Sequence, residues 1–337
     1  MGDAGKLTAA HAEGDAVKFG ILQFFSWPER RVALPTVYQR ALQRIEIMDR
    51  TGYDAVWLTE HHFTTYSVCP SIPVLGTYAA ARTKNLRIGT AVCLAAFYHP
   101  LRLAEEIALL DILSGGRVNW GAGRGYDLDE FKTFGVPFDE SYVRFREAVD
   151  IVVRAWTSER LTYNGKFFSF DNVEVLPKPL QQPHPPVWMA ASSPGTIEWA
   201  ASVGYSILMD PHATHSELGE KRELYQRKLE ENGHSIEGRE IPMARLLAIA
   251  PTDDKAAEVA RQGAIWMLKS YVNPSLFNVA DPVKRYIDEV IIHGSPECAV
   301  DEIARLHEEI PLDYLIGAPL SHETFMLLTD KVLPKLL

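Results

Sequence analysis

The sequence is poor in cysteine, and its cysteines are not paired. Three of the 337 residues are cysteines, Cys69, Cys93 and Cys298, and no C-x-x-C pair occurs. An odd and scattered set provides neither a disulfide framework nor a thiolate metal site. Thiols that stay reduced are typical of a reducing compartment, so the sequence predicts a cytoplasmic protein.

Long apolar runs and blocks of basic charge are also absent from the sequence. No stretch reaches the roughly 18 apolar residues that a membrane helix needs. The formal net charge is −10, which argues against nucleic acid or an anionic membrane as the main partner. The N-terminal stretch lacks the apolar core of a signal peptide. We therefore expect a flexible leader over residues 1–16 and a single domain over residues 17–337.

What the sequence does contain is a regular alternation of short apolar segments with helical patterns. The alternation implies a parallel sheet, and eight such units in one chain favour a closed (β/α)8 TIM barrel. No G-x-G-x-x-G follows the first apolar segment, which argues against a Rossmann fold. We expect strands at residues 18–24, 54–59, 86–92, 117–123, 186–192, 205–210, 243–251 and 312–319.

Two segments interrupt this alternation. Residues 161–182 have an Asn-Gly turn between aromatic and β-branched residues, which predicts a hairpin inserted after the fourth strand. Residues 272–296 contain three prolines, so we expect an irregular insertion after the seventh strand.

Polar and small residues follow the expected strands. Active sites of (β/α)8 barrels lie where the strands end, so these residues are candidates for one common site. In chain order they are Glu60, His61 and His62; Thr90, Ala91 and Val92; Arg124 and Glu130; Ser192, Ser193, Gly195 and Thr196; and Asp210 and His212.

The fourth and fifth strand ends together suggest a phosphate site. An arginine side chain such as that of Arg124 can form a charge-assisted, bidentate bond to phosphate. The Ser192–Thr196 segment places hydroxyl and amide groups at the start of a helix, where free N–H groups attract anions. The alternative is that these serines only cap the helix.

The adjacent histidines could instead bind a metal ion. Neighbouring residues on an extended segment point to opposite sides, so His61 and His62 do not readily bind one ion together. The sequence contains no H-E-x-x-H motif. We expect no metal. A further alternative is one exposed histidine and one that is hydrogen-bonded in the wall.

Five segments keep their order and spacing as a set: YDAVWLTEHHFT, LRIGTAV, HPLRLAEEIALLDILSGGRVNWGAGRG, FKTFG and ASSPGTIEWAASVG. These segments resemble the luciferase-like flavin-dependent monooxygenases, and in particular the bacterial luciferases of that family. The resemblance implies a (β/α)8 barrel, often dimeric, that uses reduced FMN (FMNH2) from a separate flavin reductase and O2 as co-substrate. A C4a-peroxyflavin then oxygenates an aldehyde, ketone or other small organic substrate.

The resemblance also assigns roles residue by residue. His61 matches a catalytic acid or base, with His62 and Glu130 beside it, and Arg124 matches the arginine that binds the flavin phosphate. Ala91 and Val92 match a pair joined by a cis peptide against the flavin ring. The other cofactor-binding residues that it implies are Glu60, Thr90, Ser192, Ser193, Gly195 and Thr196.

One departure from the family pattern bears on the reaction. Gly123 stands where luciferase has a reactive cysteine, and the missing side chain predicts room for a bulkier substrate. The segment at residues 270–277 resembles the start of a mobile loop that closes over the flavin. Two alternatives remain: a barrel of the same family that uses the deazaflavin F420 for hydride transfer, and a flavin-binding protein without turnover.

Overall fold

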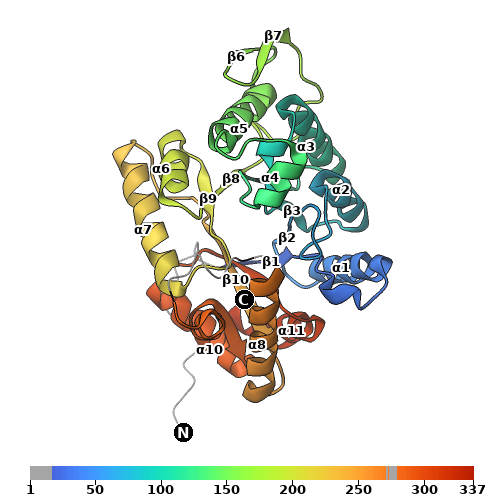
Figure 1. Ribbon diagram of the computed structural model, residues 1–337, viewed down its shortest axis with the longest axis vertical. Coiled ribbons are helices and arrows are strands. Elements are labelled where there is room, and N and C mark those ends of the chain that lie inside the picture. Colours follow the sequence, from blue (N-terminus) through green and yellow to red (C-terminus); the bar gives the residue numbers. More distant parts are fainter. Residues whose placement is uncertain (1–16, 271, 273–278) are drawn as a thin grey trace.

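The computed structural model describes residues 17–270, 272 and 279–337. It shows a mixed α/β fold in which a curled parallel sheet is surrounded by helices (Figure 1). The expected leader at residues 1–16 and most of the expected loop at residues 270–277 lie outside the described residues.

All eight expected strands form, each within two residues of its expected limits. Most of their residues are buried, as in parallel sheets that are covered on both faces. The strands are β1 (Lys18–Gln23), β2 (Ala55–Leu58), β3 (Arg87–Thr90), β5 (Val118–Gly123), β8 (Val187–Ala190), β9 (Ser206–Leu208), β10 (Pro242–Ile249) and β12 (Tyr314–Pro319).

The strands follow the order β11–β10–β12–β1–β2–β3–β5–β8–β9. One end of this order, β9, approaches β10, the second strand from the other end, because Met209, which follows β9, forms a parallel bridge to Met243 on β10. The Met209 N–H donates to the Pro242 carbonyl over 2.9 Å, and the Ala244 N–H donates to the Met209 carbonyl over 3.1 Å. The sheet is therefore curled far enough to join β9 to β10.

Three short structural elements accompany the eight expected strands, and one of them was not predicted. Residues 272–296 were expected to be irregular, but β11 (Ile291–Gly294) lies within them and pairs in parallel with β10. The prediction was wrong because the three prolines indicate irregular structure and because four residues are too few to show a strand pattern. The hairpin is confirmed as β6 (Leu161–Asn164) and β7 (Ser169–Val173), and β4 (Cys93–Leu94) pairs with β5.

Helices cover the outside of the sheet (Figure 1). Several end where glycine adopts a left-handed conformation, as at Gly115 with φ of 73° and Gly204 with φ of 77°. The helices are α1 (Leu34–Met48), α2 (Ile72–Arg82), α3 (Pro100–Ser114), α4 (Leu128–Phe134), α5 (Ser141–Thr157), α6 (Pro194–Val203), α7 (His215–Glu231), α8 (Asp253–Ser270), α9 (Pro282–Arg285), α10 (Pro296–Glu309), α11 (His322–Leu327) and α12 (Leu333–Leu336).

Aromatic side chains fill part of the space inside the curl. Trp57 on β2 meets Trp188 on β8 and Tyr314 on β12, at ring-centroid distances of 5.4 and 6.0 Å. Neither strand is a neighbour of β2 in the sheet, so these rings meet across its interior. The Trp57 indole N–H donates to the Tyr314 hydroxyl over 3.1 Å. This packing leaves the polar groups of the strand ends to form the site beyond it.

No helix in the described part of the chain is both apolar enough and long enough to span a membrane.

Candidate active site

A cavity of about 760 Å³ opens among the segments that follow the strands. Residues from beyond β2, β3, β5, β8 and β9 line it together. The candidate residues that line it are Glu60, His61, Ala91, Val92, Arg124, Glu130, Ser192, Asp210 and His212. Of the remaining candidates, none of His62, Thr90, Ser193, Gly195 and Thr196 is part of the lining within the described structure. Nine of the candidate residues therefore share one cavity.

His61 and His62 have different surroundings, as expected for neighbours on an extended segment. His61 lines the cavity and packs edge-on against Tyr66, with ring centroids 5.1 Å apart. Its Nδ1 lies 3.6 Å from Oε1 of Glu130. His62 turns toward the protein, where its Nε2 lies 3.1 Å from Oε1 of Glu60. Of the two, His61 is thus the histidine that faces the cavity.

Glu60 is buried and both of its oxygens have protein partners. Tyr98 donates to Oε2 over 3.1 Å, and His62 contacts Oε1. Burial raises the pKa of Glu60, and the contacts with His62 and Tyr98 oppose this shift without cancelling it. The Glu60–His62–Tyr98 cluster holds the segment after β2 from behind, so Glu60 acts here as a support for the site wall.

Glu130 connects α4 to the segment after β2. It is 2% exposed, and its Oε1 accepts a hydrogen bond from the main-chain N–H of His62 over 2.8 Å. The same oxygen is the one near His61. One carboxylate oxygen thus fixes the backbone at His62 and faces the imidazole at His61. At this distance the carboxylate can restrict the orientation of the imidazole.

The peptide bond between Ala91 and Val92 is cis, as the resemblance implies. Thr90, just before it, joins β3 to β5: its Oγ1 donates to the Gly121 carbonyl over 2.6 Å and accepts from the Gly121 N–H over 2.7 Å. A Cβ at position 121 would lie 2.1 Å from the Thr90 carbonyl oxygen, so only glycine fits there. Thr90 therefore holds the wall in place and does not itself reach the cavity.

The room expected beside Gly123 is not there. A Cβ at this position would lie 2.4 Å from Cγ2 of Val92 and 3.4 Å from Cβ of Ala190. The Val92 side chain already occupies the space that the missing cysteine side chain leaves. The prediction of extra space for a bulky substrate was wrong. The sequence does not show that Val92, which follows β3, packs against Gly123 at the end of β5.

Arg124 lines the cavity beside two aromatic rings. Its guanidinium carbon lies 4.8 Å from the ring centroid of Phe138 and 5.9 Å from that of Tyr142. Its Nη1 donates to the Ser141 hydroxyl over 3.1 Å. Burial lowers the pKa of Arg124 from its ordinary value, yet an arginine remains protonated at neutral pH. The cavity thus has a positive charge held in place by its neighbours.

The start of α6 lies next to this arginine. The Tyr142 hydroxyl is 3.1 Å from Oγ1 of Thr196, whose Oγ1 is also 3.1 Å from the Ser193 hydroxyl. In the described structure the Ser193 hydroxyl does not accept from an amide of the first helical turn. Pro194 has no N–H, and the Thr196 and Ile197 N–H groups donate to the Ser193 carbonyl. An anion at this helix start would therefore meet the Gly195 N–H, the hydroxyl groups of Ser193 and Thr196 and, one ring away, Arg124.

Sequence reasoning missed a second arginine at the same place. Arg146 stacks 4.4 Å from the Tyr142 ring centroid, and its Nη2 donates to the Tyr142 hydroxyl over 3.1 Å and to the Gly195 carbonyl over 3.2 Å. The i, i+4 spacing of Tyr142 and Arg146 on α5 was the only signal, and it does not by itself indicate a site.

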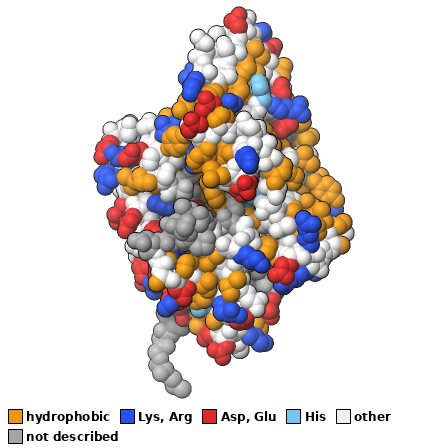
Figure 2. All heavy atoms as spheres, viewed as in Figure 1, with side chains coloured by type: hydrophobic (Ala, Val, Ile, Leu, Met, Phe, Trp, Pro, Cys, Tyr) orange, Lys and Arg blue, Asp and Glu red, His pale blue; other side chains and the backbone are white. Residues whose placement is uncertain are grey.

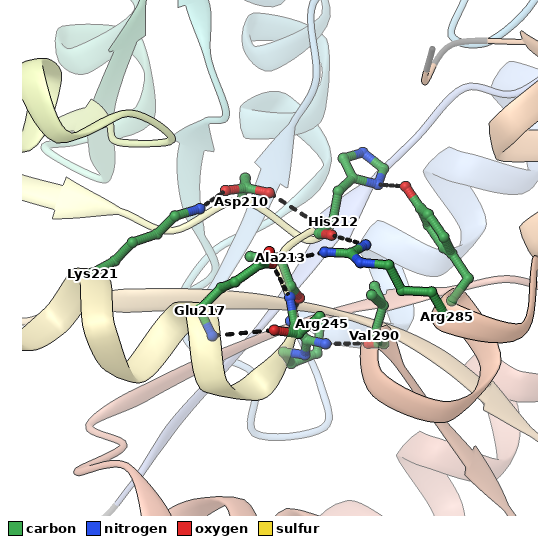
Figure 3. A network of polar contacts seen from close by, with 10 residues as sticks. Asp210, His212, Ala213, Glu217, Lys221, Arg245, Arg285 and Val290 are labelled. Carbon is green, nitrogen blue, oxygen red and sulfur yellow. Dashed lines mark hydrogen bonds and ion pairs between the residues drawn. The ribbon is translucent and has the colours of Figure 1, made fainter. Parts of the chain in front are cut away.

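The opposite wall of the cavity is a polar network around the segment after β9 (Figure 3). Lys221 donates to Asp210 over 2.8 Å, and Asp210 accepts from the main-chain N–H of His212 over 3.0 Å. Arg285 donates to Glu217 over 2.8 Å. Burial acts to raise the pKa of Asp210, but the charge and hydrogen bond of Lys221 and the contacts with His212 together outweigh it, so that pKa is lowered. This wall is held by ion pairs, unlike the apolar interior.

The network makes a pH-dependent contribution to stability that we expect to be measurable. Burial lowers the pKa of His212 from 6.5 to about 4. The unfolded chain therefore binds a proton at this position below pH 6.5 while the folded chain resists it until pH 4, so stability falls as the pH decreases through this window. The free energy of unfolding of His212→Gln, from urea titrations, should decrease less than that of the wild type between pH 6.5 and pH 4. Parallel pH dependence of the two proteins would contradict the buried neutral state.

The sequence profile described as luciferase-like monooxygenase matches residues 17–311. This chain belongs to the luciferase-like monooxygenase family. Two curated members of the family are similar over about two thirds of the chain. The oxygenase component of the flavin-dependent trigonelline monooxygenase of Acinetobacter baylyi is 31% identical over 67% of this chain and 63% of the relative. The alkanal monooxygenase alpha chain of Photorhabdus luminescens is 30% identical over 71% of this chain and 67% of the relative. The matching part of this chain spans only 51 to 63% of the length of three such relatives, the trigonelline enzyme among them.

Several solved structures share the fold. The monooxygenase RslO1 of Streptomyces bottropensis superposes with a TM-score of 0.84 at 27% identity, covering 94% of this chain and 99% of that chain. The oxygenating constituent of 3,6-diketocamphane monooxygenase of Pseudomonas putida, in complex with FMN, gives 0.80 at 20% identity over 96% and 99%. An F420-dependent secondary alcohol dehydrogenase gives 0.77 at 21% identity over 96% and 99%. The last two likenesses concern the fold alone.

Proposed function

We propose that this protein is the oxygenase of a two-component system, which uses FMNH2 and O2 to oxygenate a small apolar organic substrate such as an aldehyde or ketone. The observation that carries the proposal is that His61, the Ala91–Val92 pair and Arg124 come from three different strand ends and line one cavity. These are the groups that the family resemblance assigns to proton transfer, the flavin ring and the flavin phosphate. We also propose that the curled sheet closes as a (β/α)8 barrel through the Met209–Met243 bridge.

The residues present fit FMN. A cationic side chain lies in the cavity next to an exposed helix start, which is the donor set that a phosphate monoester needs. Arg124, Ser192, Ser193, Gly195 and Thr196 would hold the phosphate, and the Ala91–Val92 backbone would lie against the ring system. When bound, the reduced cofactor supplies the electrons that activate O2.

The other residues of the cavity wall would transfer a proton to or from the substrate and exclude water from the cavity. His61, backed by Glu130, holds or releases a proton at the substrate oxygen. Leu22, Phe24 and Tyr66 give the cavity an apolar floor that keeps water from the reacting atoms. Glu60 and His62 act behind them, as supports of the segment that carries His61.

An enzyme that uses F420 would have the same fold as one that uses FMN, so the choice between the two cofactors rests on the relatives. We favour FMN because two curated relatives with identities of 31% and 30% are named as monooxygenases. We disfavour a flavin-binding protein without turnover because the buried Glu130 carboxylate faces the His61 imidazole over 3.6 Å, an arrangement suited to proton transfer.

Two partners accompany this proposal. A separate flavin reductase would supply FMNH2, as the description "oxygenase component" of one relative implies for that protein. A second copy of the chain would cover the apolar side chains that gather over α2 and α3, at the right edge of Figure 2. The exposed members of this patch are Val74, Tyr78, Leu109, Ile112 and Leu113. An exposed apolar patch of this kind is typical of a protein interface.

Anaerobic titration with reduced FMN and with reduced F420, in parallel, tests the proposed cofactor. We expect saturable binding of reduced FMN and weaker binding of reduced F420. Oxygen is then admitted, and the return of oxidised-flavin absorbance and the release of hydrogen peroxide are followed with and without a panel of aldehydes and ketones. Oxygenated product with less peroxide supports a monooxygenase. Preference for F420 together with no oxygen-dependent product would overturn it.

A further inference from the structure

A second cavity, of about 530 Å³, lies at the opposite end of the strands from the candidate active site. Residues at the beginnings of the strands, and in the segments that lead into them, line it. Within the described structure it shares no lining residue with the active-site cavity. Along β2, the buried Trp57 stands between Asp54, which lines the second cavity, and Glu60, which lines the first. The two cavities are therefore separate sites.

Two polar side chains of β3 and β5 face the interior of the curl at this end. Gly89 on β3 faces the interior, because a Cβ there would lie 2.4 Å from the Trp57 ring. Side chains alternate along a strand, so Arg87, two residues earlier, faces the same way. Asn119 on β5 pairs in register with Gly89 and is 2% exposed, yet it lines the cavity. An arginine and an amide thus stand together inside the beginning of the sheet.

Neutral acceptors alone fix the Arg87 guanidinium. Its Nε donates to Oδ1 of Asn119 over 2.7 Å, and its Nη2 donates to the Val118 carbonyl and to Oε1 of Gln181, each over 3.0 Å. In the described part of the chain, Nη1 of Arg87 and Nδ2 of Asn119 donate to no group, and no carboxylate lies within 4.0 Å of the guanidinium. A cation taken out of bulk water is ordinarily paired with a carboxylate. Arg87 therefore offers a fixed charge and a donor group to a ligand.

A second arginine lines the cavity from a different side. Arg239, which lies before β10, donates from Nε to the Ser235 carbonyl over 2.6 Å and from Nη1 to the Gly204 carbonyl over 2.7 Å. Among the described residues it also has no carboxylate within 4.0 Å. β12, β1 and β2 separate β10 from β3 along the sheet. The two guanidinium groups therefore reach one cavity from well-separated strands.

The acidic residues of the cavity have other partners. Glu240 pairs with Lys18, and Asp54 accepts a hydrogen bond from the Tyr314 hydroxyl over 2.6 Å. Burial and the nearby charge of Arg87 act to lower the pKa of Lys18, but Glu240 and Asp54 outweigh them, so that pKa is raised. With the two arginines, the lining carries three basic side chains of lysine or arginine and two carboxylates. The cavity is therefore locally positive in a chain whose formal net charge is −10.

We propose that this cavity is a second ligand site, which binds a small dicarboxylate with one carboxylate at Arg87 and Asn119 and the other at Arg239. Guanidinium groups bind carboxylates through charge-assisted, paired hydrogen bonds. The volume lies in the range of about 300–1,000 Å³ that is typical of small-molecule sites. Pro186 and Val187 give the lining an apolar part, which suits the carbon chain between two carboxylates. This inference goes beyond the proposed function and does not depend on the reaction.

Isothermal titration calorimetry of the full chain with succinate and glutarate tests the site. Saturating FMN is present throughout to fill the candidate phosphate site, and the ionic strength is held constant with sodium chloride. We expect saturable binding of one dicarboxylate per chain. Propionate and butyrate, which carry a single carboxylate, should bind about 10- to 100-fold more weakly, as expected for the loss of hydrogen bonds to a charged group. Equal affinity for mono- and dicarboxylates, or no saturable heat, would overturn the proposal.

Three variants locate the bound dicarboxylate. Arg87→Gln and Arg239→Gln each remove one of the two cations, and in either variant succinate should bind about as weakly as butyrate binds to the wild type. Arg124→Ala changes the other cavity and should bind succinate as the wild type does. Succinate binding that is lost in Arg124→Ala and retained in the glutamine variants would place the anion in the active-site cavity and overturn the proposal. Because each arginine is tested separately, and circular dichroism shows which variants fold, one misfolded variant leaves the other to decide.

Discussion

Replacing His61 by alanine is expected to leave the binding of reduced FMN nearly unchanged and to reduce product formation by about 10²- to 10⁴-fold, the usual contribution of a positioned acid or base. The imidazole lines the cavity next to Glu130 and lies on a different strand end from Arg124, so its loss should not disturb the phosphate site. Hydrogen peroxide release should rise as product falls, because O2 is still consumed. Both quantities can be measured in one reaction with a saturating reductase.

His99→Ala is the matched control for this experiment. His99 is exposed, packs edge-on against Phe168 with centroids 5.6 Å apart, and does not line the cavity. It should leave product yield and peroxide release as in the wild type. Unchanged product yield in His61→Ala would remove that histidine from the mechanism, and equal losses in both variants would point to a general loss of stability.

The second large effect is expected for Arg124→Ala, which should weaken the binding of FMN but leave riboflavin, which lacks the phosphate, almost unaffected. A hydrogen bond to a charged group contributes about 1.5–3 kcal/mol, so the dissociation constant for FMN should rise by about 10- to 100-fold. Fluorescence titration of the wild type and the variant with both flavins measures the difference. The hydrogen-bond and ring partners of the guanidinium, Ser141 and Phe138, lie at and just before the start of α5, so the apolar floor should stay intact.

Arg160→Ala provides the control for charge alone. Arg160 is half exposed on the hairpin and pairs with Glu174 over 3.5 Å, far along the chain from the site residues. The Arg160→Ala variant loses one positive charge outside the cavity, and it should bind both flavins as the wild type does. If Arg124→Ala weakens riboflavin as much as FMN, Arg124 acts on the flavin ring or on the fold and not on the phosphate.

The sequence was informative wherever function depends on residues near a strand end. Short apolar segments between helical patterns located all eight expected strands, and the residues after them were enough to predict that His61, Ala91 and Arg124 meet. This succeeded because parallel strands deliver their carboxyl ends to one edge of the sheet. Family resemblance then supplied the roles, which periodicity and composition do not contain.

Features that depend on packing between distant segments could not be predicted. Arg146 reaches the start of α6 from α5, and nothing in its local sequence marks it. Val92 fills the space beside Gly123, and β11 is hidden among prolines until it pairs with β10. The buried pairing of Tyr286 with His212 joins residues 74 positions apart. Each of these is a contact across the fold, set by the curl of the sheet rather than by a pattern along the chain.

The contact between Val92 and Gly123 has a consequence for how this pocket can change. Because a Cβ at position 123 would overlap Cγ2 of the valine, the two sites share one fixed volume at the wall of the cavity. A chain that regains a cysteine at 123 must shorten residue 92 in compensation, and a chain that enlarges residue 92 must keep glycine at 123. Substitutions at these two positions are therefore expected to covary among homologues, and libraries that aim to reshape the pocket should randomise them together.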